Sequence, residues 1–339
     1  MSSRLIRSCA VAALAFAASA QAQVLYNQNF DVDPTASWTF NSAIAGDTAN
    51  DNAGNEAIFF FDYSTVGIPA APGAVGTRGL KVEANVPSAA AGVFTGMSAS
   101  PTGLVLPNEY ILRAHVWQNA NGATTPPGFP GGGPGSTQVT NMTVGATGAA
   151  SEFPGGTMTG VQGGVTGEGG SGTDWRMYSA SFPDGPGAVI SPSAHPGVYA
   201  AGNTAADLNN TDAYYTAPFP GQTPPAAQTA LFPQQNGTTQ NGTPAFRWNL
   251  WEIRKTSTEI TWSLNGTLIA TLPSSLFPAN FGSNFALGQM DINATTTDAT
   301  GRPVLFGLFD NVEVVAIPEP GALALSGLGA LGMLRRRRR

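Results

Sequence analysis

The sequence contains few histidine and cysteine residues that could take part in catalysis or metal binding. The histidines are His115 and His195, and the single cysteine, Cys9, lies in an apolar stretch near the N-terminus. A Ser-His-Asp triad or a histidine-based metal site would need one of these two imidazoles, and the sequence has no Gly-x-Ser-x-Gly nucleophile elbow. His195 lies in the loop-like sequence Ser-Ala-His-Pro. The sequence therefore predicts neither nucleophilic nor thiol catalysis.

Paired carboxylates could support glycan hydrolysis, in which one carboxyl group acts as acid and the other as base or nucleophile. Glu252 and Glu259 are seven residues apart across an expected turn, and Glu56 and Asp62 flank the apolar run 58–61. Neither spacing places two carboxylates close together on one strand. Carboxylates from distant positions can still meet in space, so a polysaccharide-acting hydrolase or lyase stays as the alternative to a non-catalytic protein.

Aromatic and basic residues occur together on several expected strands. Sugar binding needs aromatic faces that stack on pyranose rings, with polar neighbours for the hydroxyl groups. The candidate glycan-binding residues are Arg113, His115, Trp117, Trp175 and Trp251. The alternative is that these side chains belong to the interior, which is the assignment for Trp262 because Ile260 and Leu264 share its face of a strand.

Oxygen ligands are present near both ends of the expected domain, among them Asp31 and Asp310. If the first and last strands lie side by side, these two carboxylates approach each other, and Ca²⁺ would relieve their repulsion. The alternative is that both are solvated turn residues. No other cofactor is expected.

Period-two alternation of apolar and polar residues recurs along the chain, whereas no segment of the body has sustained helical periodicity. Asn265-Gly266 lies between two such runs and predicts a hairpin with a type I′ turn. The expected strands are 24–30, 38–44, 56–63, 80–86, 92–98, 109–118, 137–144, 175–182, 246–254, 258–264, 267–272, 284–292 and 304–315. Many short strands with turn-rich spacers predict an all-β sandwich or jelly roll.

Three long spacers separate these strands, at 119–136, 145–173 and 183–243. Gly (42) and Pro (26) are frequent, yet hydrophobic residues make up 42% of the chain and exclude a disordered protein. The spacers are expected to be long Gly/Pro-rich loops or to carry short strands that the pattern does not reveal. The sequence Gly-Glu-Gly-Gly-Ser-Gly at 167–172 fits a dinucleotide-binding pattern, but a strand pattern rather than a helix follows it.

The N-terminus has the order of a secretory leader. Arg4 and Arg7 precede an apolar run, and Ala20 and Ala22 are small residues at alternating positions, as signal peptidase requires. We predict a signal peptide at residues 1–22 that forms a helix and is removed by signal peptidase. The alternative is an uncleaved anchor, for which the apolar run is short.

The C-terminus has three parts in a fixed order. Pro318, Glu319 and Pro320 come first, an uncharged stretch at 321–334 follows, and five arginines end the chain. Fourteen helical residues reach about 21 Å, short of a hydrocarbon core of roughly 30 Å. Arginines are retained on the cytoplasmic side, so the stretch would stop translocation with only transient membrane contact.

These three parts resemble the PEP-CTERM sorting signal, here at residues 317–339. The resemblance implies recognition by an exosortase, a membrane enzyme that would remove the tail near the Pro-Glu-Pro motif. It also implies an exported protein that is first held at the inner membrane and then reaches the cell surface or the extracellular space. Such proteins are typical of bacteria that make extracellular polysaccharide. A plain tail anchor is the alternative.

Charge is unevenly distributed. Of 15 basic residues, two lie in the first ten positions and five end the chain, so eight remain in the body against 20 of the 21 acidic residues. A body with a charge of about −12 repels phosphate backbones, and nucleic acid is therefore not an expected partner.

A second resemblance concerns the body, residues 24–315. Asn29-Phe30-Asp31, Trp262-Ser263-Leu264-Asn265-Gly266 and the run 306–314, Phe-Gly-Leu-Phe-Asp-Asn-Val-Glu-Val, are similar to the concanavalin A-like, laminin-G-like jelly roll. In that family the first and last strands lie side by side. The resemblance implies a single jelly-roll β-sandwich between the signal helix and a short C-terminal hydrophobic helix.

Together these patterns predict an exported, non-catalytic β-sandwich with a structural or glycan-adhesive role. Extracellular polysaccharide is the expected partner after export. The alternatives are a polysaccharide-acting enzyme of the same fold and a Ca²⁺-dependent adhesion module.

Overall fold

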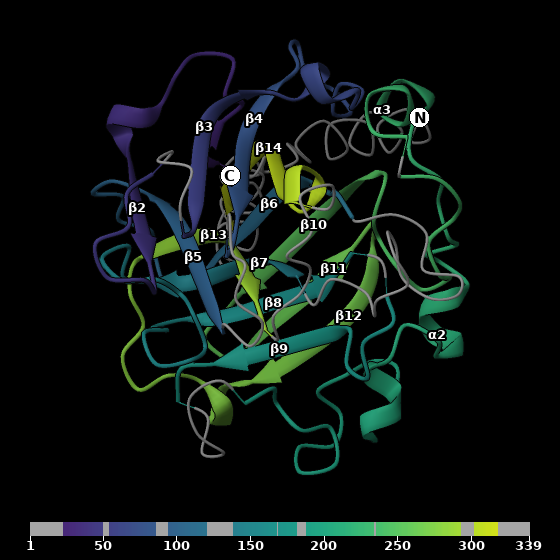
Figure 1. Ribbon diagram of the computed structural model, residues 1–339. Coiled ribbons are helices and arrows are strands. Elements are labelled where there is room, and N and C mark those ends of the chain that lie inside the picture. Colours follow the sequence, from purple (N-terminus) through teal and green to yellow (C-terminus); the bar gives the residue numbers. More distant parts are fainter. Residues whose placement is uncertain are drawn as a thin grey trace, which may run out of the picture.

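Two antiparallel β-sheets stacked face to face form the body of the protein (Figure 1). The computed structural model describes residues 23–49, 54–85, 94–120, 138–167, 169–181, 188–233, 235–292 and 302–317. The signal peptide and the sorting tail, with Ala20, Ala22 and Pro318 to Pro320, lie outside these ranges.

The larger sheet has eight strands, in the order β12-β11-β10-β6-β14-β4-β3, with β1 paired to β14. Its strands are β1 (Val24–Gln28), β3 (Glu56–Asp62), β4 (Arg78–Glu83), β6 (Tyr110–Gln118), β10 (Trp248–Lys255), β11 (Glu259–Leu264), β12 (Thr267–Pro273) and β14 (Gly307–Ala316). The Asn265-Gly266 hairpin is confirmed between β11 and β12, where both residues have positive φ (49° and 79°).

The smaller sheet has six strands, in the order β2-β5-β13-β7-β8-β9. Its strands are β2 (Trp38–Ser42), β5 (Thr95–Pro101), β7 (Gln138–Ala146), β8 (Val161–Thr166), β9 (Trp175–Ser179) and β13 (Asn284–Asp291). The chain crosses between the sheets repeatedly, so that neighbours in each sheet are mostly distant in sequence. This is a jelly-roll β-sandwich, as the sequence predicts.

The first and last strands of the sandwich are neighbours. Val24 pairs with Val315 and Gln28 with Val312, in antiparallel register. The expected adjacency of the first and last strands is confirmed.

Large aromatic side chains fill the space between the sheets. Trp175 comes from the smaller sheet, Trp251 and Trp262 come from the larger, and none of the three is exposed. Ring centroids are 5.9 Å apart for Trp175 and Trp262, and 5.6 Å apart for Trp251 and Trp262. The large side chain of Trp262 packs directly against Gly163 of β8. Position 163 has no room for a side chain, because a Cβ atom there would lie 2.6 Å from the indole ring. Trp262 is thus confirmed as a core residue.

Strand β8 was not expected, because its sequence, Val-Gln-Gly-Gly-Val-Thr, looks like a loop. It lies inside the expected spacer 145–173 and pairs with β7 on one side and with β9 on the other. The spacer 183–243 also contains ordered elements, namely η3 (Ala205–Leu208), α2 (Ala213–Thr216) and α3 (Ala226–Leu231). The alternative that the spacers carry short strands is confirmed for 145–173, whereas the ordered elements of 183–243 are short helices.

Short 3₁₀ helices make most of the remaining regular structure. They are η1 (Thr35–Ser37), η2 (Tyr63–Val66), η4 (Ser274–Leu276) and η5 (Arg302–Val304). Within the described ranges, none of the helices has the length and apolar character needed to cross a bilayer.

Candidate functional site

The five candidate glycan-binding residues do not form one surface. Pairing of Trp251 with Ala114 places Trp251 on the inner face of the larger sheet, while Trp175 lies in the other sheet. Arg113, His115 and Trp117 alternate along the outer face of β6. Both core tryptophans have no exposed surface and Trp117 is 1% exposed, so none of the three can stack on a sugar ring. The prediction that these five residues form one glycan-binding surface was wrong.

Arg113 is held in an ion-pair cluster on the outer face of the larger sheet. Its Nε lies 2.7 Å from Glu252 Oε2 on β10, and its Nη1 lies 3.8 Å from Glu313 Oε2 on β14. These are cross-strand neighbours in the sheet register. Arg113 thereby joins three strands, and its shortest ion pair is with Glu252.

His115 is opposite Asp310 on β14 and Leu250 on β10. Its ring is half-buried, and its Nδ1 has no hydrogen-bond partner among the described residues. Burial lowers the pKa of the imidazole below its usual value near 6.5, which keeps it neutral at pH 7. His115 is therefore a neutral neighbour of a buried carboxylate.

The sequence-predicted carboxylates Asp31 and Asp310 are near enough to influence each other electrostatically. Asp310 is 1% exposed; its Oδ2 accepts a hydrogen bond from Tyr63 Oη (2.9 Å), and its Oδ1 accepts one from Asn311 N (2.6 Å). Burial raises the pKa of Asp310 to about 6, and the negative charge of Asp31 adds to the rise. The two carboxylates repel each other across a partly buried space.

Gly76 lies beside Asp31 and next to Tyr63, the hydrogen-bond donor to Asp310. Its carbonyl oxygen is 3.4 Å from Tyr63 Oη, and a Cβ atom at this position would be only 2.2 Å from Asp31 Oδ1. Asp31 is oriented by Asn29, whose Nδ2 donates to Asp31 Oδ2 at 2.8 Å. The loop before it turns through Phe30, which has a φ of 57° and no exposed surface.

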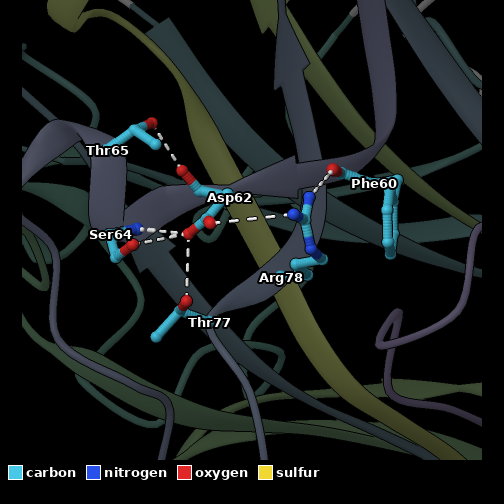
Figure 2. Close-up of polar contacts among 6 residues, drawn as sticks. All are labelled: Phe60, Asp62, Ser64, Thr65, Thr77 and Arg78. Atoms are coloured by element: carbon cyan, nitrogen blue, oxygen red, sulfur yellow. Dashed lines mark hydrogen bonds and ion pairs between the residues drawn. The ribbon is translucent and has the colours of Figure 1, made fainter.

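Tyr63 is positioned by the network that Figure 2 shows around Asp62. Asp62 caps η2: its Oδ1 accepts hydrogen bonds from Ser64 N (3.1 Å) and Ser64 Oγ (2.6 Å). Thr77 Oγ1 donates to the same oxygen at 2.9 Å, and Arg78 Nη2 lies 3.8 Å from Asp62 Oδ2.

Arg78 also donates to the carbonyl oxygen of Phe60 (3.0 Å) and stacks on the Phe60 ring. These contacts fix the end of β3 next to the start of β4, and so direct the first residue of η2 toward Asp310.

Two carboxylates and a backbone carbonyl make an oxygen-rich set of the kind that Ca²⁺ prefers. Among the described residues no group of three His, Cys, Asp or Glu side chains is placed to hold a metal. A cation between Asp31 and Asp310 would therefore need main-chain oxygens such as that of Gly76, and water, to complete its shell. The residues fit such a cation in type, and this site remains a proposal.

The outer face of the smaller sheet is polar but covered. Residues 147–159 lie over it: Asn41 Nδ2 donates to Gly148 O (3.2 Å), Ser98 Oγ to Ala150 O (3.4 Å) and Gln162 Nε2 to Glu152 O (2.7 Å). Ser98 and Gln162 have no exposed surface. Alternation alone would place these polar side chains in water, and only the tertiary structure shows that a loop buries them.

Comparison with known proteins identifies the C-terminus. Residues 316–339 match the model of the PEP-CTERM protein-sorting motif. The chain thus carries an exosortase sorting signal. The motif marks an exported protein that is sorted to the cell surface or the extracellular space and whose tail is processed. No curated protein matches the chain significantly.

Solved structures with similar folds are distant in sequence. A protein of unknown function with a galectin-like fold from Bacillus subtilis is 8% identical, with a TM-score of 0.40, over 86% of this chain and 96% of its own. The laminarinase from Rhodothermus marinus is 12% identical (TM-score 0.39; 88% and 98% covered). The carbohydrate-binding module CBM66 from Bacillus subtilis is 6% identical (TM-score 0.33; 78% and 98% covered).

Proposed function

We propose that this exported protein is a non-catalytic, glycan-adhesive β-sandwich that attaches to neutral extracellular polysaccharide at the cell surface. The sorting signal is the observation that carries the proposal, because it delivers the sandwich to the compartment where such polymers accumulate. Signal peptidase and an exosortase would process the two ends, with residues 321–334 in transient contact with the inner membrane.

The contacts of three glutamates support a structural role for these side chains. Glu252 and Glu259 are paired with Arg113 and Arg254, and Glu152 accepts hydrogen bonds from backbone N–H groups within its own loop. A glycosidase instead needs two carboxyl groups that face one substrate bond. In the described part of the chain these acidic side chains stabilise the fold.

Charge favours a neutral partner over an acidic one. The body between the two processed ends carries a charge of about −12 by sequence. Polymers rich in uronate or sulfate would be repelled at low ionic strength, whereas an uncharged glucan or mannan would not.

Affinity electrophoresis of residues 23–317 in gels that contain a soluble polysaccharide tests this function. We expect retardation by at least one neutral polymer, such as a β-glucan or a mannan, and none by alginate. The same protein should release no reducing sugar and no unsaturated uronate from these polymers. Free migration in every gel would contradict the adhesive role, and product release would establish the enzymatic alternative.

Ca²⁺-dependent adhesion is the second candidate, favoured by the proximity of Asp31, Gly76 and Asp310. In that case retardation in the gels should disappear on chelation and return with Ca²⁺. Retardation that chelation leaves unchanged would separate any cation from glycan binding.

A further inference from the structure

An open hollow lined by amide- and hydroxyl-bearing residues lies between two segments of the region that follows β9. Its walls are residues 210–211 and Thr216 on one side and residues 238–241 on the other, and its volume is about 460 Å³. Asn210 and Thr239 are 1% and 3% exposed, whereas Thr211, Thr238 and Asn241 are exposed. The pocket therefore has a buried polar base and an open rim, and its volume lies within the usual range for small-molecule sites.

Hydrogen bonds join the two walls directly. Asn210 Nδ2 donates to Gln240 Oε1 (3.1 Å) and to the backbone oxygen of Asn241 (2.7 Å). Asn210 N donates to Asp174 Oδ2 (2.9 Å), which ties this wall to the start of β9. The two walls are thus joined through the side chain of Asn210, and the buried carboxylate of Asp174 holds the Asn210 backbone in place.

The opposite wall is fixed in the same way. Thr239 N donates to Gln222 O (2.9 Å), and Asn241 Oδ1 accepts a hydrogen bond from Gly221 N (2.9 Å). Gly242 has a φ of 81°, and a Cβ atom there would lie 1.8 Å from Asn210 O, so that only glycine permits this close approach. Both walls are preorganised.

The hydrophobic core supports the pocket from behind. Tyr215 of α2 stacks on Trp175, with ring centroids 4.6 Å apart and an interplanar angle of 14°. Phe219 packs on the same indole at 5.1 Å, and Gly242 N donates to Phe219 O. Loop residues that would otherwise move are in this way anchored to the centre of the sandwich.

Lining chemistry points to an uncharged ligand. The lining side chains are amides and hydroxyls, with no charged group among them. They supply no positive charge to neutralise a phosphate or a carboxylate. Each can both donate and accept, which matches sugar hydroxyl groups.

The side-chain amide of Asn210 has a buried oxygen that accepts no hydrogen bond from the described residues. Its Nδ2 must face the backbone oxygen of Asn241, which can only accept, and this fixes the orientation of the amide. The Oδ1 atom then has no hydrogen-bond partner within the described part of the chain. A buried carbonyl without a donor is costly, and a ligand hydroxyl or a water molecule at the pocket base would relieve that cost after a small rearrangement.

We propose that the Asn210 pocket (residues 210–211, Thr216 and 238–241) binds a neutral saccharide unit. This inference rests on the proposed adhesive function and names its site. It places the contact on the region after β9, away from both the outer face of β6 and the covered face of the smaller sheet.

Saturation-transfer difference NMR on residues 23–317 tests the pocket with small sugars. The probes are glucose, mannose and N-acetylglucosamine, with galacturonate as the charged comparison. We expect transfer to at least one neutral sugar and none to galacturonate. Thr238→Trp fills the pocket from an exposed rim position and should weaken the binding about tenfold or more. Thr211→Trp, on the opposite wall, should do the same.

Thr223→Trp is the matched control, because Thr223 is exposed and lies in the same region, between α2 and α3, but does not line the pocket. It should bind like the wild type, and all three variants should melt within a few degrees of it. Equal binding by Thr238→Trp, Thr211→Trp and wild type would overturn the pocket assignment. If these variants are still retarded in polysaccharide gels, the adhesive function stands without this site. Absence of transfer to any neutral sugar would also overturn the assignment.

Discussion

Gly163 of β8 offers the sharpest test of how the two sheets pack. A methyl group at this position would lie 2.6, 2.9 and 3.0 Å from three ring atoms of Trp262, where ordinary contacts begin at about 3.4 Å. The indole cannot shift freely, since Trp175 and Trp251 lie against it and none of the three side chains is exposed. We therefore expect Gly163→Ala to destabilise the protein through overpacking.

The size of the effect follows from two opposing terms. Overpacking in a filled core costs about 1–3 kcal/mol. Loss of glycine flexibility in the unfolded chain returns about 0.5–1 kcal/mol, because Gly163 does not adopt a positive φ. The net loss is about 0–2.5 kcal/mol, centred near 1 kcal/mol, and a loss of 1 kcal/mol corresponds to a decrease in melting temperature of about 2–4 °C for a domain of this size.

Urea unfolding and thermal melts of matched variants measure this effect. Gly172→Ala is the control, because a Cβ atom there meets nothing within 4 Å and the residue is exposed. The double variant Gly163→Ala/Trp262→Leu should be more stable than the sum of the single effects, with a coupling of about 0.5–3 kcal/mol. If Gly163→Ala is as stable as Gly172→Ala, or if the two core changes are additive, the close contact between β8 and Trp262 is refuted.

Three further predictions concern charged residues. Millimolar Ca²⁺ should raise the melting temperature of residues 23–317 but not that of Asp310→Asn, and an equal shift in both would remove Asp310 as a ligand. Burial raises the pKa of Glu152 above its usual value near 4.5, so its contribution to stability is present at acid pH and is lost as the pH rises through the folded-state pKa. Urea melts between pH 4 and 8 should show a weaker pH dependence for Glu152→Gln, and an unchanged slope would argue against this origin. Arg113→Met should cost only about 1 kcal/mol or less, because its ion pairs are partly exposed, and a loss of several kcal/mol would contradict that assignment.

Local sequence patterns were sufficient for most strands. Alternation predicted thirteen of them within a few residues, because each buries one face against the opposite sheet. The pattern did not find β8, where glycines replace the side chains that would show alternation. Its only signal was the spacing of Val161 and Val165, which share the inner face with Gly163.

The candidate sites depended more strongly on tertiary structure. Asp31 and Asp310 could be connected from sequence, because pairing of the terminal strands follows from the jelly-roll resemblance. Tyr63 and Gly76, which complete that cluster, carry no such signal because a loop brings them there. The Asn210 pocket was hidden in a region that reads as low complexity, and only its packing on Trp175 reveals it.

The sequence by itself determined the route and the architecture of this protein. Its sorting motif is a linear signal, and the alternation of its strands is a local property, so both can be read without coordinates. Which tryptophans are buried, which polar face is covered and where an open pocket remains were decided by tertiary structure. These features depend on contacts between segments up to hundreds of residues apart, and no local pattern records them.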